Sequence, residues 1–584
     1  MALNRQAELC YKLATLTGQF SSDLPDKAES LEDWLADRPM LDVEQLLYQI
    51  PSYIQEMNQV DLTDKVRFEM LEMLRPITAH ICREIIKRIR KGKGLSLSLE
   101  FQEMEWLINV LLQEISLGYQ RLLFNKTIKN PRFYNRSDYA LLAERAMYYL
   151  GERIIFVYML HSVVPHSIWH DLNSSYRFAR KAHLNAIQIS DGFALKQSMK
   201  CTIDIIYKRI LLLTILSPQS LRSAEIEQVY FGLLPLIDTI KLTTDFSSSN
   251  EQHIINWESN LGPHYSDAIN HNADNWFIDT AEFINELTKC LNTEQVAVLD
   301  VDVGISKKLL KKIISKLDGS MKRSDKRIRA DGQRVEVIIG LQNIDVFLGN
   351  AEALKNNTDS PIQKKESDEG TINHHLHEQA TQGDSDTSFY NAIDTAKPGV
   401  DQEEVVKKAN EPVGEKHYYL KIENESAAGV CLTCDTSQAE GLGIGELLLI
   451  LGRGVDIWKL GIVCWIKTEN KKVDLGVYFL GGELDCINVS LATDSKNIRK
   501  AHWLQKGQSG ATVLLETTAF RPGDVINTQR RGIDLTLILH EIIWENEVFS
   551  QFGFELINVE TNTTESDSTH AKREQDYLIP SWEK

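Results

Sequence analysis

The residues best suited to binding chemistry lie in one basic stretch of the chain, residues 307–334. These 28 positions carry eleven cations and three acids, a net charge of +8, in a protein whose formal net charge is -18. The cations are Lys307, Lys308, Lys311, Lys312, Lys316, Lys322, Arg323, Lys326, Arg327, Arg329 and Arg334. An acidic protein is a poor non-specific binder of nucleic acid or anionic membrane, so any anion site in this chain must be a local basic exception of this kind.

The lysines and the arginines of this stretch differ in context. Residues 306–317 have the pattern of an amphipathic helix, and the simplest interpretation of its five lysines is a solvated helix face. The arginines follow that helix, in a loop with Gly, Ser and Asp that leads into a predicted strand at residues 334–339. The arginines are therefore the stronger candidates for ligand contacts.

Two short motifs connect these arginines to a later part of the chain. Arg323 and Arg327 have the spacing Arg-x-x-x-Arg, and Asn424, Ser426 and Gly429 form Asn-x-Ser-x-x-Gly in the next β segment. Strand-like segments follow at residues 447–451, 461–465 and 475–479. Together these features resemble the two-part signature of the PilZ domain, a small β-barrel that in many bacterial proteins is a receptor for cyclic di-GMP. The resemblance covers about residues 320–490.

The residue types of the two motifs suit this ligand, which carries two phosphate charges and two guanines. Guanidinium groups can fork onto phosphate oxygens or onto guanine O6 and N7, and their flat faces can stack on a purine. Asn and Ser side chains can hydrogen-bond base edges, while a glycine allows close backbone approach. The resemblance implies that Arg323 and Arg327 clamp the nucleotide from a flexible lead-in. It also implies that Asn424, Ser426 and Gly429 hold the nucleotide against the barrel.

Two departures from the family pattern leave an alternative open. Arg327 and Asn424 are 97 positions apart, whereas family members usually have the two motifs close together, and Asn424 stands where Asp is commoner. An insertion in a loop need not disturb a barrel. The alternative is a PilZ-like scaffold that keeps the barrel without its ligand and recruits protein partners through a helical domain.

The elements that must position these motifs fall into two classes. In residues 1–318 apolar positions recur at three- and four-residue steps, as between residues 66 and 89, which is the helical period. Pro76 is expected to kink or divide that helix. After residue 415 the apolar pattern has period two, in short runs separated by Gly, Asp and Asn, which is typical of a small barrel or sandwich. The predicted fold class is α+β.

This pattern divides the chain into six segments. Residues 1–318 are expected to form a large all-α domain, 319–349 the basic lead-in and first strand of a PilZ-like antiparallel β-barrel, and 416–490 the remainder of that barrel. Residues 350–415 are polar, with Phe389 and Tyr390 as the two aromatics, and are expected to be a disordered insert. Residues 491–565 are expected to be a further small β region, and residues 566–584 a flexible tail.

Weaker signals favour ordinary structural roles. Cys431 and Cys434 resemble half a zinc or redox site, but no second pair or suitably spaced histidine lies near them in the sequence. The glycines at 441, 443 and 445 precede a strand instead of a helix, so they are interpreted as a turn. His166 and His170 could share a helix face, where packing or surface roles are commoner than a metal site. We predict no catalytic residues, no metal ligands and no cofactor, with cyclic di-GMP as the ligand.

Composition and length complete the prediction. At 584 residues, 43% hydrophobic and 25% charged, the chain is globular and long enough for several compact units. Its eight cysteines are scattered, and it has neither a secretory signal pattern nor a membrane-spanning apolar run, which indicates a cytoplasmic protein. We expect no nucleic-acid partner and no membrane insertion.

The predicted function is that of a signalling effector that is not an enzyme. It would bind cyclic di-GMP at the barrel and couple that binding to an interaction surface for an unidentified protein partner on the helical domain. By resemblance, the processes controlled would be motility, attachment or exopolysaccharide output.

Overall fold

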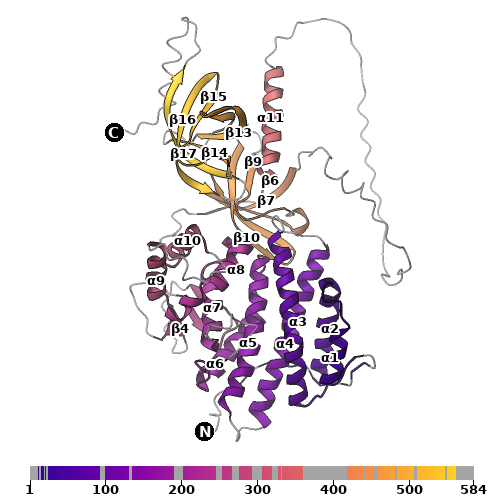
Figure 1. The fold of residues 1–584 in the computed structure, drawn as a ribbon. Coiled ribbons are helices and arrows are strands. Elements are labelled where there is room, and N and C mark those ends of the chain that lie inside the picture. Colours follow the sequence, from indigo (N-terminus) through magenta and orange to yellow (C-terminus); the bar gives the residue numbers. More distant parts are fainter. Residues whose placement is uncertain are drawn as a thin grey trace, which may run out of the picture. The chain divides into compact units, whose positions relative to one another are not determined.

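A computed structural model describes most of the chain between residues 24 and 560. The described ranges are 24–91, 99–129, 135–189, 201–244, 253–265, 275–292, 305–318, 327–358, 417–451, 458–480, 483–505, 510–545 and 549–560, without Asp331, Glu440 and Thr518 and with single positions between 9 and 21. They form two compact units, residues 1–337 with 418–482 and residues 338–417 with 483–584. Figure 1 shows the helices and strands of both units.

The first unit begins with a stack of long helices. They are α1 (Ala28–Ala36), α2 (Val43–Gln59), α3 (Asp64–Lys91), α4 (Leu99–Lys129), α5 (Arg136–Met159), α6 (His166–Lys181), α7 (Ile203–Ile215) and α8 (Ser223–Gly232), with the 3-10 turns η1 (Pro218–Ser220) and η2 (Leu234–Thr239). α4 packs against α2, α3 and α5, and α5 also contacts α6, α7 and α8 (Figure 1). Most residues of α5 are buried, so this helix is the centre of the stack. Pro76 lies inside α3 and does not divide it.

Residues 241–279 depart from the all-helical expectation. The strands β1 (Lys241–Thr243), β2 (His253–Asn256), β3 (His264–Tyr265) and β4 (Asn275–Asp279) form an antiparallel sheet in the order β1-β4-β2-β3. Ile255 and Ile278 of this sheet belong to the same hydrophobic core as the helices. Strands of two to five residues are too short to show a clear period of two, which is why the sequence pattern did not reveal them.

The helices α9 (Ala281–Asn292) and α10 (Lys307–Leu317) complete the helical part. α10 is the amphipathic helix that the sequence predicts. The Ser306 hydroxyl accepts a hydrogen bond from the backbone N–H of Leu309 at 3.1 Å, which caps the first turn. Leu309, Leu310 and Ile313 are buried, so the apolar face packs on the core as expected.

Two lysines of α10 differ from the predicted solvated face. Lys312 Nζ lies 3.2 Å from Glu225 Oε2, and Lys316 Nζ donates to the Leu216 carbonyl at 2.6 Å. Burial, with the charge of Lys312 nearby, lowers the pKa of Lys316 to about 8. These two lysines therefore attach α10 to the helical stack, while Lys307, Lys308 and Lys311 are exposed.

The first unit ends in a ring of strands. These are β5 (Ile328–Arg329), β6 (Arg334–Ile339), β7 (His417–Ser426), β8 (Gly429–Asp435), β9 (Leu447–Leu451), β10 (Trp458–Glu469) and β11 (Lys472–Phe479), with the 3-10 turn η4 (Thr436–Gln438). Of these strands, the last two residues of β6 and the first residue of β7 are counted with the second unit. Their order is β5-β7-β6-β9-β10-β11-β8, and β8 pairs with β7 as well as with β11. Strands β6 to β11 therefore close into a barrel, whose interior contains Leu432, Leu448 and Leu475, each fully buried.

The second unit consists of α11 (Leu341–Thr358) and a second closed barrel. Its strands are β12 (Glu483–Leu491), β13 (Asp494–Gln505), β14 (Ala511–Glu516), β15 (Val525–Arg530), β16 (Ile533–Glu545) and β17 (Phe549–Glu560), in the order β12-β13-β14-β17-β16-β15. Trp503, Leu537 and Phe552 fill its core. The expected small β region is thus a complete barrel, and its first strand begins at residue 483, within the segment expected to finish the first barrel.

The predicted fold class, α+β with a helical N-terminal part and antiparallel barrels, is confirmed. Of the expected insert at residues 350–415, the first nine residues continue α11, and residues 359–416 lie outside the described residues, as does the expected tail at 566–584. Of the helices that the structure describes, none combines the length and apolar character needed to span a bilayer.

Candidate functional site

Strand pairing between β5 and β7 brings the arginine loop to the Asn-x-Ser-x-x-Gly motif. The two strands are antiparallel, with Ile328 opposite Glu425 and Arg329 opposite Asn424. Two backbone hydrogen bonds extend the contact, from Ala330 N to the Glu423 carbonyl at 3.3 Å and from Ile422 N to the Gln333 carbonyl at 2.8 Å. The 97 positions between the motifs are therefore no obstacle to their proximity.

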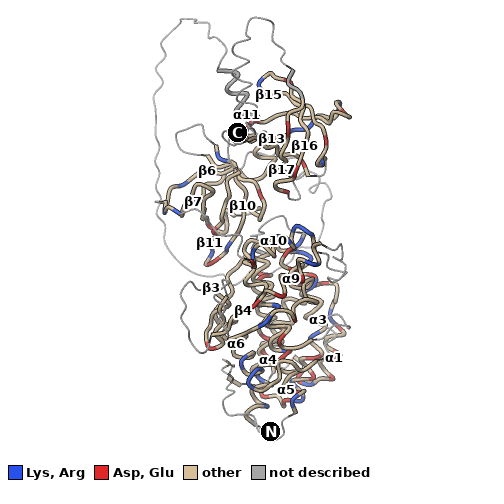
Figure 2. Tube along the Cα trace, turned by 90° about the vertical axis from the view of Figure 1, so that its left-hand side faces the viewer, with Lys and Arg blue, Asp and Glu red and all other residues tan. Residues whose placement is uncertain are grey.

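A hollow of about 530 Å³ opens beside this pairing. It is lined by Arg329, Ala330, Gly332, Lys421, Glu423 and Asn424. Two cations and one carboxylate face it, and Lys421 Nζ lies 3.0 Å from Glu423 Oε1. Figure 2 marks basic residues beside β7 and along α10. The hollow is open and polar, which suits a charged ligand better than an apolar one.

Of the two predicted arginines, the structure describes only Arg327. Arg327 is exposed and immediately precedes β5, two residues from Arg329. Arg323 lies outside the described residues. In the described parts of the chain, neither Arg327 nor Arg329 has an ion-pair partner, so both guanidinium groups can accept an anionic ligand.

Sequence reasoning missed Arg329 and Lys421 as members of this site. Arg329 was one of eleven cations in the basic stretch, and its place two residues after Arg327 gave it the same loop context. Lys421 lies three residues before Asn424, on the strand that carries the second motif. Only the register of β5 on β7 singles these two cations out from the other nearby lysines and arginines.

Ser426 and Gly429 close the hairpin between β7 and β8. They face each other across a two-residue turn, and the Ser426 hydroxyl donates a hydrogen bond to the Gly429 carbonyl at 3.2 Å. The hydroxyl proton of Ser426 is therefore engaged, while its oxygen lone pairs can still accept a hydrogen bond from a ligand.

Gly429 has a packing reason to be glycine. It pairs with Tyr478 of β11, and a Cβ atom at this position would lie 2.2 Å from the backbone oxygen of Val477. A backbone oxygen cannot rotate away, so any side chain here would separate β8 from β11. The glycine of the motif thus secures the closed ring on which Asn424 is carried.

Two protein-family models match the chain. Residues 29–245 match the model described as the N-terminal domain of the cyclic-di-GMP receptor FimW, and residues 253–483 match the model of its middle PilZ domain. The chain carries a PilZ domain. The resemblance predicted from the two motifs is confirmed, together with the helical domain that precedes it.

One curated protein shows the similarity over almost the whole chain. It is the cyclic-di-GMP receptor FimW of Pseudomonas aeruginosa, 21% identical over 590 residues, which span 94% of each chain. No solved structure matches the chain. Apart from its first residue, Glu483, the C-terminal barrel lies beyond the stretches that the two family models match.

The weaker sequence signals have ordinary surroundings in the PilZ domain and in the helical domain. Cys431 and Cys434 are both buried on β8, and burial raises the pKa of the Cys434 thiol to about 12, so it stays protonated. The glycines at 441, 443 and 445 form the turn before β9 that was expected. His170 Nδ1 lies 3.0 Å from Asp171 Oδ1, and His166 contacts the Asn260 carbonyl instead.

The PilZ domain is attached to the helical domain within the same compact unit. The Thr468 backbone N–H donates to the His161 carbonyl at 2.8 Å, and the Arg222 Nε donates to the Ile444 carbonyl at 3.3 Å. Thr468 pairs with Val473 near the start of β11, whereas Gly429 pairs with Tyr478 near its end. The Thr468 contact therefore lies at the opposite end of β11 from the Ser426–Gly429 hairpin.

Proposed function

We propose that this protein is a cyclic-di-GMP receptor, a cytoplasmic signalling effector that performs no catalysis. The main support for this proposal is the pairing of Arg329 with Asn424, which brings the arginine loop and the second motif together at one hollow. The family descriptions, which name a cyclic-di-GMP receptor, agree with it.

The hollow, together with Arg327 and Ser426 near its lining in sequence, offers groups that suit a dinucleotide with two phosphates. Arg327 and Arg329 supply planar forks that can hold a phosphate or a guanine edge, and Lys421 adds a point charge. Asn424 and the acceptor side of the Ser426 hydroxyl can meet base N–H groups. Arg323, four residues before Arg327, is proposed as a further clamp from the same loop. No step of this binding needs proton transfer or bond cleavage.

We propose that the helical domain transmits ligand binding at the barrel to a protein partner. Ligand capture would draw the arginine loop onto β7 and bias the state of the barrel, which is fastened to the helices through Arg222 and Thr468. A protein partner on the helical domain would then sense the change, in control of motility, attachment or exopolysaccharide output.

Matched substitutions test whether the arginines form a site. Arg327→Ala and Arg329→Ala should each remove charge-assisted hydrogen bonds of about 1.5–3 kcal/mol, roughly ten- to a hundredfold in affinity for cyclic di-GMP. Arg327→Lys should restore only part of the affinity lost in Arg327→Ala, because the point charge of an ammonium group cannot make the forked contact of a guanidinium group. Ser426→Ala should cost about 1 kcal/mol, one neutral hydrogen bond. Affinities are measured by calorimetry.

Lys311→Ala is the control, because Lys311 is exposed on α10 and its loss changes the net charge equally. It should leave the affinity nearly unchanged. Equal losses from Lys311→Ala and the arginine variants, both abolished by added salt, would mean diffuse attraction to a basic surface. The ligand-free scaffold would then be the better account of the barrel.

A further inference from the structure

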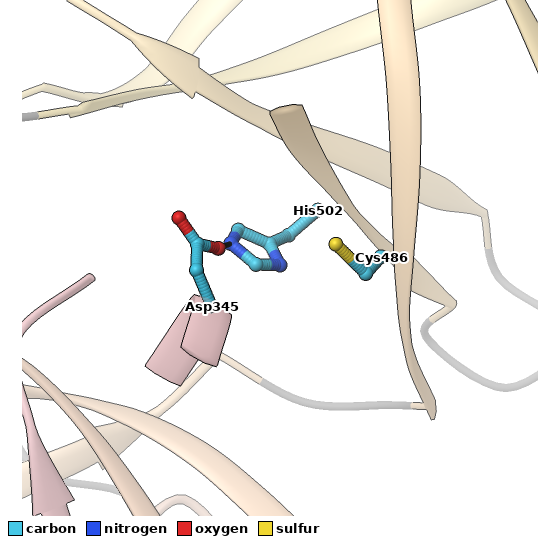
Figure 3. A group of neighbouring side chains, drawn as sticks. All are labelled: Asp345, Cys486 and His502. Atoms are coloured by element: carbon cyan, nitrogen blue, oxygen red, sulfur yellow. Dashed lines mark ion pairs between the residues drawn. The ribbon is translucent and has the colours of Figure 1, made fainter. Parts of the chain in front are cut away.

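Three potential metal ligands meet in the second unit. Cys486 of β12 and His502 of β13 are directly opposite each other across an antiparallel strand pair, and Asp345 approaches from α11. One ligand atom from each of the three lies within 4.8 Å of the other two (Figure 3). Figure 3 shows the Asp345 carboxylate and the Cys486 thiol on either side of the His502 ring.

The place of this cluster in the barrel explains its burial. Ile487, Ala501 and Trp503 point into the barrel core, so their chain neighbours Cys486 and His502 lie on the outer face. His502 is nevertheless only 3% exposed. α11 contacts β12, and Asp345 Oδ1 lies 2.7 Å from His502 Nε2, so the side of the helix that carries Asp345 covers this face.

The hydrogen bonding of Asp345 and His502 is incomplete within the described residues. Asp345 Oδ1 lies 2.7 Å from His502 Nε2, yet the two atoms are not aligned as a hydrogen bond. The second ring nitrogen, Nδ1, is buried and has no hydrogen-bond partner in the described parts of the chain. Buried polar atoms are normally satisfied, so a buried imidazole with an unused nitrogen beside a thiol calls for a further ligand.

We propose that Asp345, Cys486 and His502 bind a transition-metal dication, with zinc as the best fit. A thiolate disfavours magnesium and calcium, which prefer all-oxygen sites, whereas thiolate, imidazole and carboxylate together are ligands that zinc accepts. Tetrahedral ligands at about 2.0–2.3 Å from zinc lie roughly 3.3–3.8 Å apart, so Asp345 Oδ1 must move away from His502 Nε2. The carboxylate and the thiol must both rotate toward one ring nitrogen, and a water molecule would take the fourth position. Binding would deprotonate the Cys486 thiol and release its proton to solvent.

The proposed metal acts as a structural cross-link. Its ligands come from α11, β12 and β13, so binding would hold the helix on the outer face of the barrel. Sequence analysis could not find this site, because residues 345, 486 and 502 share no short motif of the kind that zinc sites show. The cluster exists only through strand register and the position of α11.

The same barrel offers an ordinary histidine–carboxylate pair for comparison. His540 Nε2 lies 3.2 Å from Glu555 Oε2, and both side chains are more than half exposed. This pair faces water, whereas His502 is enclosed next to a thiol. His540→Gln therefore serves as the matched control for His502→Gln, and Cys464→Ser, a half-buried thiol of the PilZ domain, serves as the control for Cys486→Ser.

The test uses the full-length protein after treatment with a chelator. Titration with Co²⁺ should give one equivalent of bound metal with a thiolate-to-cobalt charge-transfer absorption, and Zn²⁺ should displace it. Cys486→Ser should abolish that absorption, while His502→Gln and Asp345→Asn should each weaken Co²⁺ and Zn²⁺ binding at least tenfold. His540→Gln and Cys464→Ser should bind like the wild type.

A wild-type measurement guards against variants that fail to fold. Zn²⁺ should protect Cys486 from alkylation, mapped by mass spectrometry, and leave the alkylation of Cys464 unchanged. The proposal is overturned if the wild type shows no charge-transfer absorption with Co²⁺, if Zn²⁺ does not slow the alkylation of Cys486, or if Cys486→Ser keeps the wild-type metal affinity.

Discussion

Glu152 shows how one residue of the helical domain carries a pH dependence. It is buried in α5, and its Oε1 atom has no hydrogen-bond partner in the described parts of the chain. Burial raises its pKa to about 7, although the nearby charge of Arg209 and a hydrogen bond with Tyr148 oppose the rise. The carboxyl group therefore holds a proton in the folded state at pH values where the unfolded chain has lost it.

The sign of the effect on stability follows from this difference. Below about pH 4.5 the Glu152 carboxyl group is protonated in both the folded and the unfolded state. Between about pH 4.5 and 7 it is protonated only in the folded state, so the free energy of unfolding falls as the pH rises. Across that pH range, we expect the free energy of unfolding of the wild type to fall by about 3 kcal/mol relative to that of Glu152→Gln. Denaturant unfolding at pH 5 and pH 8 measures it, with exposed Glu29→Gln as control. A wild type and Glu152→Gln with parallel pH profiles would contradict the assignment.

The candidate site at residue scale was partly predictable from the sequence. Each half of the signature could be recognised by itself, because a motif fixes residue types over a few positions. Arg327 belongs to the Arg-x-x-x-Arg half, and Asn424 begins the Asn-x-Ser-x-x-Gly half. Arg329 and Lys421 were not identified, since their relevance depends on which residue of β5 faces which residue of β7. That register is a non-local property.

At the scale of elements, the hairpin of β7 and β8 supports the site by closing the first barrel. β8 is held between β7 and β11, and a Cβ atom at Gly429 would clash with the Val477 backbone oxygen of β11. Helices and most strands could be predicted because their periods are local. The closure of the two barrels and the short sheet β1 to β4 could not be predicted, because the sequence of a strand does not show which other strands it pairs with.

Gly429→Ala tests the packing role of the motif glycine. The added Cβ would meet the Val477 backbone oxygen, so β8 must shift, and we expect a destabilisation of about 1–3 kcal/mol. Gly349→Ala in α11 is the control, because a Cβ there meets nothing within 4 Å and alanine favours helix by about 0.5–1 kcal/mol. Thermal unfolding without ligand measures both. An unchanged melting temperature for Gly429→Ala would assign this glycine to ligand contact alone.

At the scale of the whole molecule, charge separates the proposed site from the rest of the chain. The protein carries a formal charge of -18, while the hollow beside β5 and β7 presents Arg329 and Lys421, with Arg327 next to it. A protein of this overall charge is a poor non-specific binder of a polyanion such as nucleic acid, whereas a compact dinucleotide needs only the few cations at the hollow. The charge distribution therefore favours a small anionic ligand over a long one.

Titration of the purified full-length protein with cyclic di-GMP by calorimetry tests the central claim most directly. We predict saturable binding with micromolar or tighter affinity and a rise in melting temperature, and no such response to GTP at the same concentration. Absence of heat and of a thermal shift at roughly millimolar cyclic di-GMP, a binding free energy weaker than about −4 kcal/mol, would contradict it.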